Sequence, residues 1–300
     1  MLPSANVRTP VTSGTNGHDD FVVALRHAQR QLRRDLPWIG HPSPWAILVS
    51  EFMLQQTSVP RVIPKWELFL QRFPNPEECA NARQSEVVRL WQGLGYPRRA
   101  QNLHRSAQTI VHHFAGEVPR TVEELLTLPG VGDYTARAMA TFAFDRPVGV
   151  VDTNVGRILA RAVQNAPLAK AEAQRLADSL VPARSAAAWN QSMLDLGAQF
   201  CRPQPRCGNC PVRSACRWNA KGGDDPAERS AGVSRRQPAF RGSRREQRGL
   251  LVRYLGDGPA TVAQLRTRDG IDVDRLNETL DGLVRDELVV RQGRRYQLRD

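Results

Sequence analysis

A glycine-rich turn between two helical patterns, in residues 128–155, constrains the fold more than any other part of this 300-residue chain. The turn is Gly130-Val131-Gly132, and glycines without a Cβ let the backbone approach a ligand closely. The turn also opens a helix, whose first N–H groups and positive dipole end face outward. These features suit phosphate binding, although an ordinary elbow between packed helices has the same pattern. Both interpretations predict a helical fold here.

The charge balance points to an acidic polymer as the partner. The chain has 42 Lys and Arg against 30 Asp and Glu, a net charge of +12. Such an excess favours nucleic acid, while a merely soluble basic protein is the alternative. The first 20 residues have no apolar segment typical of a signal peptide, and no stretch approaches the ~18 apolar residues of a membrane span. We therefore expect no membrane partner and a cytoplasmic, nucleoid-associated location.

Four cysteines within sixteen residues form the most specific local pattern. Cys201, Cys207, Cys210 and Cys216 are separated by five, two and five residues. In a reducing compartment such cysteines are metal or cluster ligands rather than structural disulfides. Zinc and a [4Fe–4S] cluster both accept four thiolates, and the spacing alone does not separate them.

A glutamate stands inside an otherwise apolar helix. Ser43-Pro44 has the pattern of a helix start, and residues 45–57 are apolar nearly all round, so the helix should be buried. Burial should raise the pKa of Glu51, which suits a general acid. The alternative is that Glu51 faces solvent or pairs with an arginine.

Polar side chains follow this helix and precede a later one. Gln55-Gln56-Thr57 at the end of the predicted helix suits contact with base edges, although a polar last turn explains it equally well. Asp152 precedes the helix predicted over 155–163, where an aspartate is first of all a helix cap. Catalysis is the alternative for Asp152.

The loop over residues 93–97 places an aromatic residue between glycines and arginines. Tyr96 could wedge between bases while Arg98 and Arg99 hold phosphates. A surface tyrosine in a turn is the alternative.

Composition divides the chain into four parts. We predict a disordered tail (1–18), a helical domain (19–218) with the cysteine loop (201–216), a basic linker (219–246) and a small domain (247–300). In the last part the pattern predicts helices over 248–255, 262–268 and 274–286, then strands over 288–291 and 295–298. This is a winged-helix-like α+β pattern, whose use in DNA binding is by fold analogy.

Four motifs precede the cysteine loop in order: SEFMLQQTSV (50–59), GLGY (93–96), LPGVGDYTA (128–136) and VDTNV (151–155). Over residues 20–218 the chain thus resembles the helix-hairpin-helix DNA glycosylase superfamily, and within it the MutY-type A/G-specific adenine glycosylases. The resemblance implies a mainly α, two-lobed glycosylase domain. The small C-terminal domain resembles the winged-helix-like tail of actinobacterial-type members rather than a Nudix-like domain.

The resemblance also implies catalytic roles. Glu51 matches the acid that protonates adenine, and Asp152 the carboxylate that stabilises the oxocarbenium-like sugar. Tyr134 matches a tyrosine beside the sugar, at a position where bifunctional relatives carry a Schiff-base lysine, so hydrolysis without strand cleavage is expected. Asn154 is similar to an asparagine beside these carboxylates.

Further positions match DNA and cluster contacts. Gln56, Thr57, Leu94 and Tyr96 match residues around the base opposite adenine, and Gln55 belongs to the same polar segment. Gly130, Val131 and Gly132 match a hairpin that grips backbone phosphate, and the four cysteines match [4Fe–4S] ligands, which makes zinc the less favoured metal.

The function predicted from the sequence is hydrolytic removal of adenine paired with 8-oxoguanine or guanine in double-stranded DNA, by a monomer. One alternative keeps the fold but removes thymine or uracil from mismatches with guanine. A second is a non-catalytic iron–sulfur DNA-binding protein.

Overall fold

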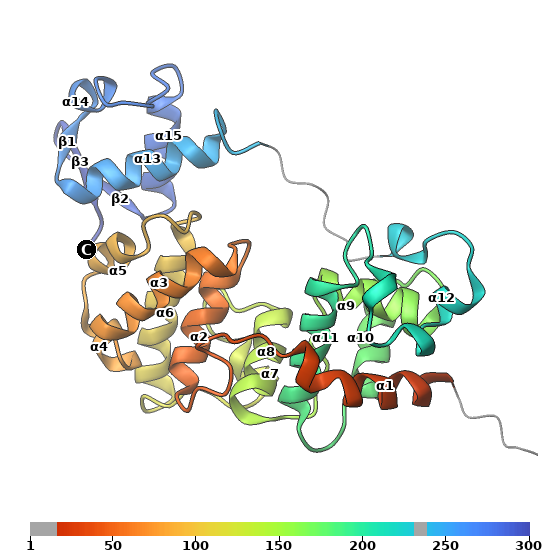
Figure 1. Cartoon of the computed structure of the whole chain (residues 1–300). Helices are drawn as coiled ribbons and strands as arrows, with labels where there is room; N and C mark the ends of the chain where they lie inside the picture. Colours follow the sequence, from red (N-terminus) through yellow and green to blue (C-terminus); the bar gives the residue numbers. More distant parts are fainter. Residues whose placement is uncertain (1–16, 231–238) are drawn as a thin grey trace, which may run out of the picture. The chain divides into compact units, whose positions relative to one another are not determined.

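A computed structural model describes residues 17–230 and 239–300 of the chain (Figure 1). The described residues are mainly helical, as predicted, and form two compact units. The described parts of unit 1 are 17–33, 151–180 and 188–230. Those of unit 2 are 34–150, 181–187 and 239–300.

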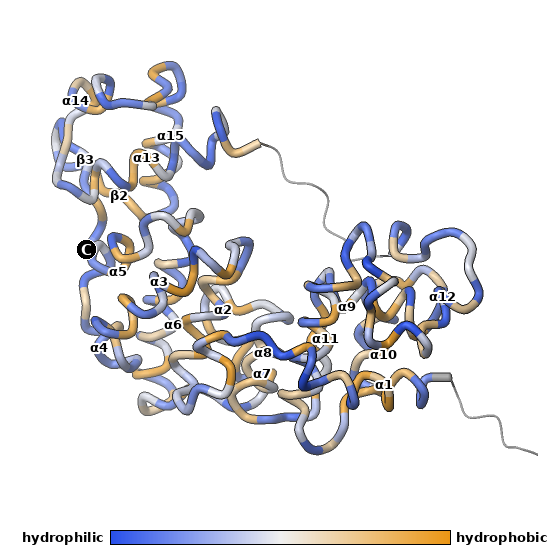
Figure 2. Tube along the Cα trace, in the orientation of Figure 1, coloured by the Kyte–Doolittle hydropathy of each residue, from blue (hydrophilic) through white to orange (hydrophobic). Residues whose placement is uncertain are grey.

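The first part of unit 2 is a bundle of helices around one apolar core. Its helices are α2 (Pro44–Leu54), α3 (Val59–Arg72), α4 (Pro76–Asn81), α5 (Gln84–Leu90), α6 (Arg98–His113), α7 (Val122–Leu125) and α8 (Asp133–Phe144). Helix α2 packs against α3, α6 and α8 and is mostly hydrophobic in Figure 2. Ser43 caps α2 by accepting a hydrogen bond from the Ala46 N–H at 3.3 Å, which confirms the predicted start. The helix ends at Leu54, three residues earlier than predicted.

Unit 1 contains the cysteine loop and the chain on either side of it. Its elements are α1 (Gly17–Leu32), α9 (Thr153–Ile158), a π-helix (Leu159–Gln164), α10 (Lys170–Leu180), most of α11 (Ala186–Gln199), α12 (Arg217–Lys221) and a 3₁₀ turn (Pro226–Arg229). Residues 1–16 of the predicted tail lie outside the described residues, whereas Gly17 and His18 already belong to α1. Two short elements, α12 and the 3₁₀ turn, lie within or overlap the predicted linker, of which residues 231–238 are not described.

The C-terminal part of unit 2 has the predicted winged-helix-like pattern. It consists of α13 (Arg244–Asp257), β1 (Ala260–Thr261), α14 (Val262–Arg266), α15 (Leu276–Arg285), β2 (Val289–Gln292) and β3 (Arg295–Leu298). The sheet is antiparallel in the order β1-β3-β2, with Val289 opposite Leu298 and Ala260 opposite Tyr296. The strand β1 was not predicted, because two residues are too short to show an alternating pattern.

Polar contacts hold this C-terminal part on α5 and α6 within unit 2. The Gln84 side chain donates to the Glu287 carbonyl at 2.9 Å, and Gln101 donates to the same carbonyl at 3.1 Å. Arg89 donates to the Gly256 carbonyl at 2.9 Å, and Arg105 forms an ion pair with Glu287. Most of these side chains donate to backbone carbonyls of the C-terminal part, so the contacts depend on the backbone positions of that part.

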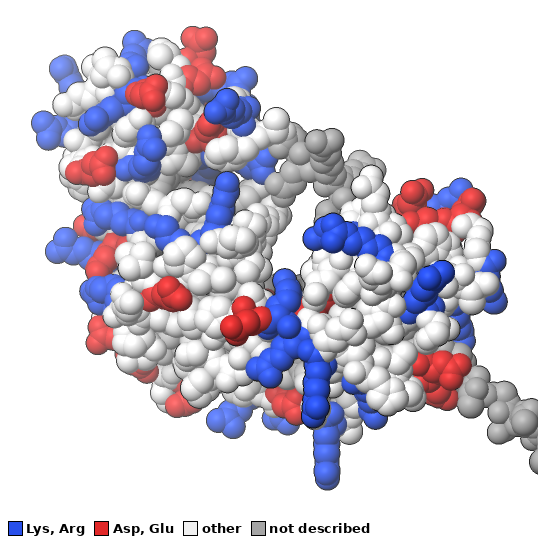
Figure 3. All heavy atoms as spheres, in the orientation of Figure 1, with Lys and Arg blue, Asp and Glu red and all other residues white. Residues whose placement is uncertain are grey.

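Among the described helices, none combines the length and the apolar character needed to cross a lipid bilayer. Basic side chains are spread over the face drawn in Figure 3, with acidic side chains between them.

Candidate functional site

Glu51 lies in the core of unit 2, as the apolar helix predicted. Glu51 is only 7% exposed, and the adjacent residues on α2, Ser50 and Phe52, are fully buried. A carboxyl group in such surroundings loses hydration that its charged form needs. Glu51 therefore occupies a buried position of α2 rather than its solvent face.

A buried arginine, Arg99, fixes the end of the helix that carries Glu51. Its guanidinium donates to the Thr57 hydroxyl and to the backbone carbonyls of Phe52, Met53, Gln55, Leu94 and Gly95, at 2.6–3.0 Å. The residue is 8% exposed, and burial lowers its pKa to about 10. The prediction that Arg99 holds DNA phosphate is thus wrong. The guanidinium instead satisfies carbonyls at the end of α2 and in loop 93–96.

The residues predicted to face the opposite base divide into two groups. Gln56 is exposed, with a positive φ of 58°, and Tyr96 is half-buried, with a φ of 48°. The others are engaged within unit 2: the Gln55 amide donates to the Thr135 hydroxyl at 3.3 Å, Thr57 contacts the Leu94 carbonyl at 3.1 Å, and the Leu94 side chain is 5% exposed. Gln56 and Tyr96 are thus the members of this set most open to a ligand.

The glycine turn of the hairpin joins α7 to α8. Thr121 and Glu124 form the predicted capping box at the start of α7. Gly130 has a φ of +80°, and a Cβ there would lie 2.6 Å from the Asn102 side chain on α6, so only glycine fits. Gly132 is the exposed N-cap of α8, with open space where a Cβ would point. Val131 is largely buried, and Tyr134 is half-buried in the first turn of α8.

Asp152 caps α9 in unit 1. One carboxylate oxygen accepts from the backbone N–H groups of Asn154 and Val155, both at 2.8 Å, and the other accepts from the Asn154 amide at 2.6 Å. The cap interpretation is therefore confirmed. Burial raises the pKa of Asp152, although these hydrogen bonds act in the opposite direction. The carboxylate is held in one orientation whatever further role it has.

Hydrogen bonds continue from Asp152 to the cysteine loop. The side-chain amide oxygen of Asn154 accepts from Arg157 at 2.6 Å, and Arg157 also donates to the Cys201 backbone carbonyl at 2.8 Å. Gly197 of α11 permits the close packing here, because a Cβ at this position would lie 2.5 Å from the Asn154 Cβ. Neither Arg157 nor Gly197 was identified from the sequence, where an arginine inside a helix and a glycine inside another carry no distinctive signal.

All four predicted cysteines line a single pocket in unit 1, with about 400 Å³ of empty space that includes open solvent. Within the described residues, no three Cys, His, Asp or Glu side chains are placed to hold a single metal ion. Burial raises the pKa of Cys210 to about 11 and also raises that of Cys201. Coordination of a metal by these sulfurs would therefore displace protons.

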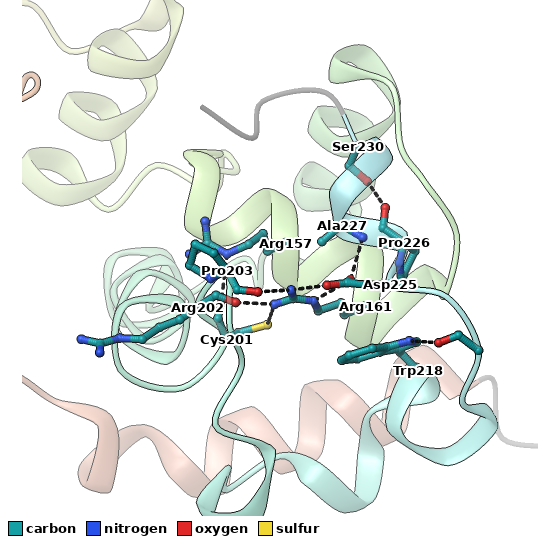
Figure 4. Close-up of polar contacts among 11 residues, drawn as sticks. Arg157, Arg161, Cys201, Arg202, Pro203, Trp218, Asp225, Pro226, Ala227 and Ser230 are labelled. Atoms are coloured by element: carbon teal, nitrogen blue, oxygen red, sulfur yellow. Dashed lines mark hydrogen bonds and ion pairs between the residues drawn. The ribbon is translucent and has the colours of Figure 1, made fainter. Parts of the chain in front are cut away.

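A second buried arginine, Arg161, binds the backbone that follows Cys201 (Figure 4). It donates to the carbonyls of Arg202 and Pro203 at 2.6 and 3.0 Å, and its nitrogen lies 3.6 Å from the Cys201 sulfur. Asp225 accepts from the same guanidinium at 2.8 and 2.5 Å. The segment around Asp225, which we predicted to be part of a linker, thus belongs to the surroundings of the cysteine pocket.

Comparison with known proteins agrees with this architecture. The family model of the HhH-GPD superfamily base excision DNA repair proteins matches residues 49–183. The adenine DNA glycosylase of Mycolicibacterium smegmatis is 45% identical over 265 residues, which cover 86% of this chain and 88% of that protein. The adenine DNA glycosylase of Mycobacterium tuberculosis H37Rv is 43% identical over 301 residues, which cover 97% of this chain and 95% of that protein. The mouse enzyme of the same name is 42% identical, with 62% of this chain and 39% of that protein covered.

Solved structures show the same fold. A thermostable thymine-DNA glycosylase superposes with a TM-score of 0.63 at 27% identity, covering 68% of this chain and 97% of that chain. Endonuclease III from a trapped covalent DNA complex superposes with a TM-score of 0.59 at 23% identity, with the same coverage.

The chain therefore belongs to the HhH-GPD superfamily of base excision DNA repair proteins. Within that superfamily it belongs to the adenine DNA glycosylases, as its identity to the mycobacterial members over most of both chains shows. The predicted family is thus confirmed, and the similarity to the Mycobacterium tuberculosis protein extends over nearly the whole chain.

Proposed function

We propose that this protein hydrolyses the N-glycosidic bond of adenine paired with 8-oxoguanine or guanine in double-stranded DNA, as a monomer in the cytoplasm. The observation that carries the proposal is a carboxylic acid, Glu51, buried in the core helix α2 of a chain that belongs to the adenine DNA glycosylases. The thymine-specific alternative has less support, because the thymine-DNA glycosylase structure is 27% identical against 43–45% for the mycobacterial adenine glycosylases.

Glu51 supplies the proton in this proposal. Adenine is a poor leaving group while its ring nitrogens are neutral, and protonation makes its departure feasible. The acid must hold its proton at the pH of the reaction, which burial among apolar side chains favours. Before the reaction the adenine must leave the base stack, since its glycosidic bond is not accessible inside the duplex.

Asp152 stabilises the positive charge that develops on the sugar as adenine leaves. A preorganised anion is effective for this task because it does not need to reorient during the reaction. The three hydrogen bonds to Asp152, two from the backbone and one from Asn154, supply that preorganisation. Position 134 holds a tyrosine and not an amine, which supports attack by water and an intact strand.

The turn formed by Gly130, Val131 and Gly132 binds a backbone phosphate in this proposal. Support comes from Gly132, which is exposed at the start of α8 and has no protein atom within 4 Å of the point where a Cβ would lie. Gln56 and Tyr96 contact the base opposite adenine. The surface around them is stabilised by Gln55, Thr57 and Leu94. The side chains of Gln55 and Thr57 and the carbonyl of Leu94 form hydrogen bonds within unit 2.

We further propose that Cys201, Cys207, Cys210 and Cys216 hold a [4Fe–4S] cluster. Four thiol groups that line one pocket fit this group. The cluster would crosslink the loop by its iron–sulfur bonds. Protein purified without oxygen should contain iron and inorganic sulfide in equal amounts, whereas stoichiometric zinc with little iron would contradict the assignment.

The base opposite the adenine defines the substrate, and a comparison of duplexes tests it. We expect single-turnover release from duplexes with adenine opposite 8-oxoguanine or guanine, and none from duplexes with thymine or uracil opposite guanine. Release of thymine or uracil alone would replace the proposed substrate. DNA binding without release from any duplex would favour the non-catalytic alternative.

A further inference from the structure

The third helix of the winged-helix-like part, α15, is poorly suited to bind DNA. Fold analogy would place this helix in the major groove. Its exposed positions include Glu278 and Asp281, and Asp286 follows directly at its end. Glu278 forms an ion pair with Arg244 of α13, and Asp286 forms one with Arg248. Because α15 itself carries Glu278 and Asp281 against one arginine, Arg285, it offers phosphate no net positive charge.

Helix α13 has the opposite character and borders a groove. The groove has about 1580 Å³ of empty space that includes open solvent, and it lies within unit 2, between loop 93–97 and α13. Its walls include Gln56 and Tyr96, to which the proposed function assigns DNA contacts.

The lining of the groove matches the chemistry of a nucleotide. Arg61, Arg245 and Arg253 line it and supply positive charge for phosphate. The acid among the lining residues, Glu246, already accepts a hydrogen bond from the Gly242 N–H at 2.6 Å. The Phe240 side chain, which is 56% exposed, offers an aromatic surface on which a base can stack.

The two walls of the groove are held together by direct contacts. Arg245 of α13 donates to the Tyr96 hydroxyl at 2.7 Å, and its guanidinium lies 5.8 Å from the centre of the Tyr96 ring. Arg89 of α5 also donates to the Gly256 carbonyl near the end of α13. The groove is therefore built jointly by the glycosylase part and the C-terminal part, and it requires both.

We propose that the C-terminal part binds the DNA substrate through α13, in the groove shared with loop 93–97, and not through α15. The occupant is a nucleotide of the strand opposite the adenine, with its phosphate near the arginines and its base against the aromatic side chains. The inference rests on the proposed function, because it presumes that duplex DNA is the substrate.

Gly249 provides a direct test, because it lines the groove from the middle of α13 and has open space where a Cβ would point. Leucine at this position should extend from the open Cβ position into the groove, and helix propensity favours it over glycine. Gly249→Leu should weaken binding of the A:8-oxoguanine duplex about tenfold, the loss of one base contact. Gly249→Ala, with a much smaller side chain, should bind nearly as well as wild type. The thermal midpoint of neither variant should fall.

Two arginine substitutions, one on α13 and one on α15, test which helix supplies positive charge to the DNA phosphate. Arg253→Gln on α13 should reduce the slope of log affinity against log salt by about one, whereas Arg285→Gln on α15 should leave it unchanged. Equal binding by wild type and Gly249→Leu, or a changed slope only in Arg285→Gln, would overturn the proposal. Wild-type binding and adenine release are measured in parallel, since their absence would instead contradict the proposed function.

Discussion

Replacing Glu51 with glutamine should lower the single-turnover rate of adenine release by about 10²- to 10⁴-fold, the range typical of a lost general acid. Glutamine has the same shape as a protonated glutamate but gives up no proton. Because Glu51 is buried in α2 among apolar neighbours, an uncharged side chain of equal size should leave the core intact. The rate is measured with enzyme in excess over an A:8-oxoguanine duplex.

DNA binding provides the control for Glu51→Gln. Affinity for the same duplex and the thermal midpoint should both remain close to wild type, because glutamine keeps the size of the protonated acid and can still hydrogen-bond to the base. A parallel loss of affinity and rate would assign Glu51 to binding, and an unchanged rate would remove it from the chemistry.

Replacing Asp152 with asparagine should lower the rate by about 10²- to 10³-fold, a typical effect of removing one preorganised electrostatic contact. Asparagine caps helices about as well as aspartate, so α9 should keep its start and the protein its stability. Asp152→Ala removes the cap as well and should cost about 1 kcal/mol of stability in addition. Comparing the rates and thermal midpoints of the two variants separates the charge from the cap. Activity retained in Asp152→Asn would leave Asp152 with the structural role alone.

The pH profile of the wild-type rate bears on the same residue. Asp152 must be ionised to stabilise the sugar cation, and burial raises its pKa. Adenine release should therefore fall as the pH decreases through a value above the ordinary aspartate range. An acid limb within or below that range would contradict the role of Asp152.

Local sequence patterns predicted the helix starts and the family. The Ser43 cap, the Thr121–Glu124 capping box and the Asp152 cap are present as expected, because each depends on side chains within three residues of the backbone groups they satisfy. The helices and the hairpin of the C-terminal part also follow the apolar periodicity of their own residues.

Features that depend on distant residues were not predicted. Arg99 looked like a phosphate ligand because arginine beside a glycine loop is usually exposed, and only the fold brings the carbonyls of Phe52 and Met53 to it. Asp225 looked like part of a linker because its partner, Arg161, is 64 residues away in the sequence. In both cases the hydrogen-bond partners meet only in the folded chain, which local periodicity does not report.

The most direct test of the central claim is to identify the product released from an A:8-oxoguanine duplex under single-turnover conditions, and to examine the strands before and after alkali. Hydrolysis by Glu51 and Asp152 without an amine nucleophile predicts free adenine and strands that break only after alkali. Strand breaks that form before alkali, or a covalent enzyme–DNA adduct trapped by borohydride, would contradict this account.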